Sequence, residues 1–143
     1  MELEEKKQWL GRYRECDMRI RALEEDLQKW QERAQSVTKP LSDMPKGNNG
    51  KNSLEEAISH IFDIGQEINE TIMEARDIKA EIEKVIDEVD NGVYRTLLRL
   101  RYIHLKKWEW IAVEMNYDYR WILRLHIKAL KKINKPHKAT ITP

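Results

Sequence analysis

Apolar residues in the first part of the chain recur with the spacing of a coiled coil. Between residues 9 and 34 they are separated by alternating steps of four and three residues, a mean repeat of about 3.5. A β-strand would alternate every second residue, so this spacing predicts one long helix with a single apolar seam. The predicted seam positions are Trp9, Tyr13, Cys16, Ile20, Leu23, Leu27, Trp30 and Ala34.

Residues 54–90 predict a second long helix with the same repeat. A capping box of Ser53 and Glu56 predicts its start, and the sequence "DNG" at 90–92 predicts its end. Its predicted seam is Leu54, Ile58, Ile61, Gly65, Ile68, Ile72, Ala75, Lys79, Ile82, Ile86 and Val89. Further apolar residues lie beside this seam, namely Phe62, Ile64, Met73, Ile78 and Val85. One partner helix would leave them uncovered, so we expect a homo-oligomer, with a dimer as the simplest form.

The segment between the two seams, residues 37–52, contains prolines and glycines and is predicted to be a linker. A parallel pairing of the helices would stretch this linker nearly to its limit, whereas an antiparallel pairing requires only a turn. Residues 1–90 are therefore predicted to form a long antiparallel coiled-coil hairpin in an all-α protein.

The remainder of the chain predicts a compact helical module over 91–135, followed by a flexible tail at 136–143. A helix follows Gly92, and two shorter helices come after it, separated by the sequence "NYD" at 116–118. Asp118 is expected to cap the last helix through its side-chain oxygen. The inward residues of that helix, Ile122, Leu125, Ala129 and Ile133, recur near helical period. Two short helices joined by a tight turn predict a helix-turn-helix.

Charge gives this module a candidate partner. The net charge of +1 conceals −9 over residues 54–90 and +9 over residues 91–143. A basic helix-turn-helix favours double-stranded DNA, with the last helix in the major groove. The residues expected to contact DNA are Tyr119, Arg120, Leu123, Arg124, Ile127, Lys128 and Lys131, together with Lys106 and Lys107. The alternative is a basic packing unit without a nucleic-acid partner.

The sequence "LLRLRYIHLKKWEWIAVEMNYDYRWILRLHIKALKKI" resembles the helix-turn-helix of sigma-factor region 4. Nearly the whole chain, including "LSDMPKGNNG", is similar to small late-gene transcriptional regulators from prophages of Gram-positive bacteria. The resemblance implies a sequence-specific DNA-binding regulator in the cytoplasm of a bacterial host cell. It also implies a contact with host RNA polymerase.

No motif in the sequence predicts an enzyme, a cofactor or a metal site. The one cysteine excludes an internal disulfide, and the four histidines are scattered. No apolar run approaches the roughly 20 residues that span a bilayer, so no membrane partner is expected. Two other hypotheses remain open at this point: the DNA-recognition (small) subunit of a phage packaging terminase, and a structural coiled-coil adaptor.

Overall fold

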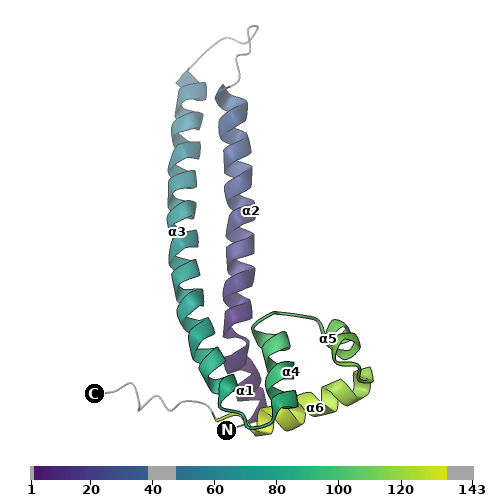
Figure 1. Ribbon diagram of the computed structural model, residues 1–143. Coiled ribbons are helices and arrows are strands. Elements are labelled where there is room, and N and C mark those ends of the chain that lie inside the picture. Colours follow the sequence, from purple (N-terminus) through teal and green to yellow (C-terminus); the bar gives the residue numbers. More distant parts are fainter. Residues whose placement is uncertain (1, 39–47, 135–143) are drawn as a thin grey trace, which may run out of the picture. The chain divides into compact units, whose positions relative to one another are not determined.

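The computed structural model describes residues 2–38 and 48–134, and this part of the chain is helical without strands (Figure 1). The all-α class is therefore confirmed. The helices are α1 (Leu3–Leu10), α2 (Arg12–Thr38), α3 (Asn48–Asp87), α4 (Gly92–Tyr102), α5 (Trp108–Met115) and α6 (Tyr119–Lys131). None of these helices is both long enough and apolar enough to cross a membrane. The predicted tail at 136–143 lies outside the described residues.

The chain divides into two compact units. The central unit is Cys16–Glu74, and the terminal unit combines Met1–Glu15 with Ala75–Pro143. This division differs from the boundary predicted at residue 90, because the start of the chain and the end of α3 join α4, α5 and α6.

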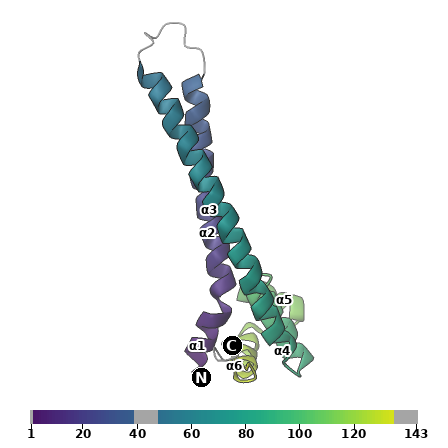
Figure 2. The same ribbon diagram turned by 90° about the vertical axis from the view of Figure 1, so that its left-hand side faces the viewer.

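In the central unit, α2 and α3 run in opposite directions (Figure 2). Arg19 near the start of α2 forms an ion pair of 3.2 Å with Glu67, and Trp30 stacks on His60 with 4.0 Å between ring centroids. As the residue number rises along α2, the number of its partner on α3 therefore falls. The less exposed side chains of α2 in this unit include the predicted positions Cys16, Ile20, Leu23, Leu27, Trp30 and Ala34.

The predicted seam of α3 is partly wrong. Ile58 and Ile72 are 54% and 37% exposed, whereas the neighbouring Ala57 and Thr71 are 0% and 2% exposed. The hydroxyl of Thr71 is satisfied within the helix, since Oγ1 donates to the carbonyl of Glu67 at 2.8 Å.

The physical reason is that the broad apolar face of α3 allows two seams that differ by a rotation of the helix. The observed seam places Ile64, Ile78 and Val85 at least half-buried. These large side chains gain more from leaving water than Gly65 and Lys79, the weak positions of the predicted seam. The prediction that all five flanking residues would stay uncovered is therefore wrong for Ile64, Ile78 and Val85.

An apolar stripe remains exposed on α3 in the central unit. Phe62 and Met73 are 62% and 64% exposed. Ile58 and Ile72 are exposed as well. Ile58 lies four residues before Phe62, about one helical turn, and Ile72 and Met73 lie ten and eleven residues after it, about three turns. We refer to Ile58, Phe62, Ile72 and Met73 as the exposed apolar stripe.

The predicted linker at 37–52 is longer than the structure allows. Helix α2 continues through Thr38 and α3 begins at Asn48, so Ser53 lies inside α3 and is not its N-cap. Both linker prolines, Pro40 and Pro45, precede Asn48. Extending an already nucleated helix costs little where no proline interrupts it, so α3 starts earlier than the capping box indicates. Residues 39–47 of the predicted linker lie outside the described residues.

The first helix is also interrupted, at Gly11, which separates α1 from α2. The backbone N–H of Gly11 still donates to the carbonyl of Lys7 at 2.8 Å, and a Cβ on Gly11 would lie 3.1 Å from the same oxygen. The side chain of Arg12 donates from Nε to the carbonyl of Trp9 at 2.9 Å. The predicted seam at Trp9 and Tyr13 therefore spans a break between two helices.

The core of the terminal unit draws on both ends of the chain. Leu10 of α1 is 0% exposed and belongs to the same apolar cluster as buried residues of α3, α4, α5 and α6. The cluster includes Ile82, Ile86, Leu97, Leu98, Ile111, Ile122 and Leu130, each 0% exposed. Helix α1 lies beside α6 (Figure 1), so the N-terminal helix is part of the core around the last helix.

Replacing Leu10 tests this role of the N-terminal helix. Leu10→Ala should lower the free energy of unfolding by about 2–5 kcal/mol, because it leaves a cavity in the core. Met18→Ala is the control: Met18 is 59% exposed, and its loss should change stability by less than about 0.5 kcal/mol. Urea unfolding followed by circular dichroism gives both values, and equal stability of the two variants would contradict the packing of α1.

Candidate nucleic-acid interface

A tight turn joins α5 to α6. Asn116 ends α5 in the left-handed conformation, at φ 61° and ψ 43°, and the next N–H, of Tyr117, donates to the carbonyl of Ala112 at 2.9 Å. Asparagine tolerates this conformation better than most residues other than glycine. Asp118 then caps α6, because its Oδ2 accepts from the N–H of Arg120 at 3.2 Å. The capping role predicted for Asp118 is confirmed.

The inner face of α6 agrees with the prediction. Ile122, Leu125 and Ala129 of α6 are buried, and Ala112 of α5 is 5% exposed. Ile133 is buried too, but it lies two residues beyond the end of α6, so its predicted place on the helix is wrong. Leu130 and His126 are buried as well. This wide inner face fixes the rotation of α6 about its axis, so the direction of its outer face is also fixed.

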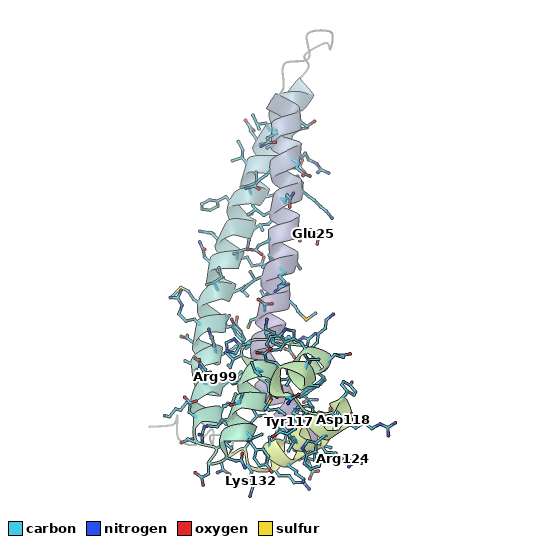
Figure 3. The ribbon with its side chains drawn as sticks, turned by 45° about the vertical axis from the view of Figure 1, so that its right-hand side comes forward. Glu25, Arg99, Tyr117, Asp118, Arg124 and Lys132 are labelled. Atoms are coloured by element: carbon cyan, nitrogen blue, oxygen red, sulfur yellow. The ribbon has the colours of Figure 1, made fainter. Side chains whose placement is uncertain are left out.

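The outer face of α6 carries a basic row. Arg120, Arg124, Lys128 and Lys131 recur at steps of four, four and three residues, and all four are exposed. Figure 3 shows Arg124 on the outer side of α6. Within the described part of the chain, none of the four forms an ion pair with a carboxylate. Their charge is therefore available to a ligand outside the chain.

The apolar residues predicted to contact DNA differ in exposure. Tyr119 and Ile127 are each 43% exposed, at the start and in the middle of α6. Leu123 is only half-buried, and it lines a cavity together with Lys7 of α1. Helix α1 therefore borders one edge of the outer face, next to Leu123 and Ile127.

The two loop lysines lie before α5. Lys107 is exposed and occupies the N-cap position of α5, without a capping hydrogen bond from its side chain. Lys106 is half-buried, and its Nζ lies 4.6 Å from the ring centroid of Trp110. On α6, Lys128 makes the same kind of contact with Trp121 at 4.8 Å. Each cation–π contact restrains a lysine and leaves its positive charge unneutralised.

Two arginines of the basic segment serve the fold instead. Arg99 on α4 forms ion pairs with Glu83 at 2.7 Å and with Asp87 at 3.5 Å, both on α3. Arg95 donates from Nη1 to the carbonyl of Val89. The acidic end of α3 thus neutralises part of α4, and the basic charge that remains free lies mainly on α6.

Lys6 is a supporting residue that the sequence did not single out. It is 9% exposed, and its Nζ donates to the carbonyl of Leu130 near the end of α6 at 2.9 Å. The C-terminal end of a helix carries partial negative charge, so a lysine there is favourable. The heptad spacing of the N-terminal segment predicted contacts with another long helix and gave no sign of this one.

A buried pair of rings supports the base of α6. Tyr102 Oη and His126 Nε2 are 2.7 Å apart and share a hydrogen bond, and the Trp108 ring lies 4.4 Å from that of His126. Burial, and then the positive charges of Lys7 and Arg101, lower the pKa of His126 to about 4. Burial likewise raises the pKa of the Tyr102 phenol. Both groups are therefore neutral at pH 7, as their hydrogen bond requires.

No cluster of three or more histidine, cysteine, aspartate or glutamate side chains in residues 2–38 and 48–134 is arranged to hold a metal ion.

Comparison of the chain with protein-family models, with curated proteins and with solved structures finds no match.

The His126 pair predicts a specific pH dependence of stability. The unfolded chain binds a proton near the ordinary pKa of 6.5, whereas the folded chain does so only near 4. Stability is therefore complete above about pH 6.5 and falls by roughly 1.4 kcal/mol per pH unit between these values. His126→Gln keeps a group that hydrogen-bonds Tyr102 and cannot titrate.

Urea unfolding near pH 7 and near pH 5 measures this effect. Between pH 7 and pH 5, the free energy of unfolding of the wild type should fall by about 2 kcal/mol more than that of His126→Gln. The carboxylates are the same in both proteins, so their effect cancels in this difference. Identical losses in the two proteins would show that His126 does not titrate as its burial requires.

Proposed function

We propose that the protein is a sequence-specific DNA-binding transcriptional regulator of prophage type, acting in the cytoplasm of a bacterial host cell. In this proposal α5, the turn at 116–118 and α6 form a helix-turn-helix similar to that of sigma-factor region 4. Helix α6 enters the major groove. The observation that carries the proposal is the row of Arg120, Arg124, Lys128 and Lys131, which is exposed and lacks carboxylate partners in the described chain.

The chemistry of this row suits duplex DNA. Arginines four residues apart on an exposed helix face reach neighbouring base pairs, where each guanidinium matches the O6 and N7 acceptors of guanine. Lys128 and Lys131, further along α6, are placed to neutralise phosphates. Tyr119, Leu123 and Ile127 would add apolar contacts at the edges of the groove. Lys106 and Lys107 would contact the backbone from the loop before α5.

The remaining features of the proposal concern assembly. The central part of α2 and α3 would form an antiparallel coiled-coil hairpin, and the exposed apolar stripe of α3 would pair with a second copy of the chain. Four exposed large apolar side chains on one charge-rich helix favour an interface, because exposed apolar area of this extent often marks one. Contact with host RNA polymerase is a further part of the proposal, and it rests on the resemblance to sigma-factor regulators.

Selection of binding sites from random duplexes, followed by fluorescence anisotropy, tests DNA recognition. Arg120→Ala and Arg124→Ala should each weaken binding to the selected site by about 1–3 kcal/mol and relax sequence preference at one position. Lys131→Ala should weaken all sequences alike and lower the slope of log affinity against log salt by about one unit.

Arg21→Ala supplies the matched control for these variants. Its side chain is 75% exposed on α2 and, among the described residues, forms its ion pair with Asp17, so DNA affinity should not change. If the folded Arg120→Ala and Arg124→Ala proteins bind the selected site as the wild type does, α6 is not the recognition helix. A wild type that binds no duplex at all would leave the structural adaptor as the better hypothesis.

The dimer is tested by charging the exposed apolar stripe. Phe62→Glu together with Met73→Glu should convert a dimer to a monomer, because each buried carboxylate would lack a partner in the interface. Met18→Glu, at a comparably exposed apolar position of α2, should leave the mass unchanged. Light scattering at tens of micromolar measures all three proteins, and a monomeric wild type would refute the proposed assembly.

A further inference from the structure

A cavity of about 430 Å³ lies in the terminal unit, between the start of the chain and α6. Three cationic side chains line it: Lys7 of α1, Arg14 of α2 and Arg101 of α4. Among the described residues that line it there is no carboxylate. Three positive charges around one hollow, without a negative group in its wall, favour an anionic ligand.

Arg101 is held in place and keeps most of its donors free. Its guanidinium carbon lies 4.5 Å from the ring centroid of Trp108, and its Nη1 donates to the carbonyl of Lys106 at 3.0 Å. Guanidinium has five N–H donors, and this is its one hydrogen bond within the described residues. The ring of Trp108 is in turn braced by His126 at 4.4 Å. The guanidinium is therefore positioned before any ligand arrives.

The other two cations are not neutralised by the wall of the cavity. Arg14 is exposed and has no ion pair in the described chain. Lys7 has a solvent-exposed pair with Glu4 at 3.8 Å, an arrangement that contributes little. Burial, and then the charge of Arg14, lower the pKa of Arg101, which agrees with two guanidinium groups facing a shared space.

We infer that Lys7, Arg14 and Arg101 form a phosphate-binding pocket beside α6. A phosphate group offers several acceptor oxygens to guanidinium forks and an ammonium group at once, and arginine matches its geometry. Arg101 already lies over the ring of Trp108, so this face of the indole is not open to a nucleotide base.

The phosphate has two possible sources, the backbone of a DNA duplex and a free nucleotide. Leu123 and Ile127 of α6 also line the pocket, so it adjoins the outer face described above. A duplex whose major groove takes α6 would bring its backbone to this edge, where the N-terminal helix would clamp it. In this form the inference rests on the proposed function, whereas binding of a free nucleotide does not.

The experiment has a duplex arm and a nucleotide arm, both with the full chain. Wild type, Arg14→Gln, Lys7→Gln and Arg21→Gln are titrated with a labelled selected duplex at several salt concentrations. The same proteins are titrated with adenosine monophosphate by calorimetry. Arg21→Gln removes the same charge from the same helix outside the pocket. Arg14 is exposed, so its replacement is not expected to unfold the protein.

If the duplex is the source, Arg14→Gln and Lys7→Gln each lower the salt slope by about one unit for all sequences, while Arg21→Gln does not. If a nucleotide is the source, the wild type binds adenosine monophosphate and the two pocket variants lose at least tenfold in affinity. Either result supports the pocket, and the second does so even if the wild type binds no duplex.

The inference is overturned if the pocket variants equal the wild type in both arms, or if the wild type binds neither probe. Duplex binding that depends on Arg124 but not on Arg14 or Lys7, with no binding of adenosine monophosphate, would remove the pocket and leave the proposed function standing. The two proposals therefore fail in distinguishable ways.

Discussion

Lys6 carries a positive charge into the terminal unit, where the carbonyl of Leu130 accepts its hydrogen bond. Removing an ammonium group from water costs several kcal/mol, and the partial negative charge at the end of α6 offsets this cost. One helical turn further along α1, Leu10 is buried in the apolar core. These two contacts hold α1 against α6, and the position of α1 defines one edge of the outer face of α6. Both the basic row and the phosphate pocket depend on that edge.

Sequence periodicity was sufficient to predict the buried face of a helix wherever the apolar residues allowed a single seam. The four-three steps of α2 predicted its less exposed side chains, because nearly all residues between them are polar and the exceptions, Met18 and Ala22, are too few to form a second seam. In α3 the pattern was ambiguous: Ala57 next to Ile58 and Thr71 next to Ile72 make two seams available. Which of the two seams is buried depends on the surfaces against which α3 packs, and the spacing of residues along α3 does not determine it.

The candidate interface was predictable to a similar degree. Ile122, Leu125 and Ala129 recur at helical period and are buried on α6, so the exposed positions of Arg120 and Arg124 follow from the sequence. The contribution of α1 could not be predicted, since Lys6 and Leu130 are 124 positions apart in the chain. A heptad segment looks the same whether it packs on a second long helix or on the core of another module. The half-buried state of Leu123, which lies beside Lys7 of α1, could not be predicted either.

The discontinuous terminal unit also bears on how the protein is made. During synthesis the first fifteen residues leave the ribosome long before α6 exists, at a rate of roughly 5–20 residues per second. For several seconds Leu10 and Lys6 have no native partners on α6, whereas α2 and α3 can already pair with each other. Contacts between distant segments slow folding because the chain entropy is lost before they form. The surface of α6 is thus completed last, so an unfinished chain would have its paired helices and no assembled DNA-binding face.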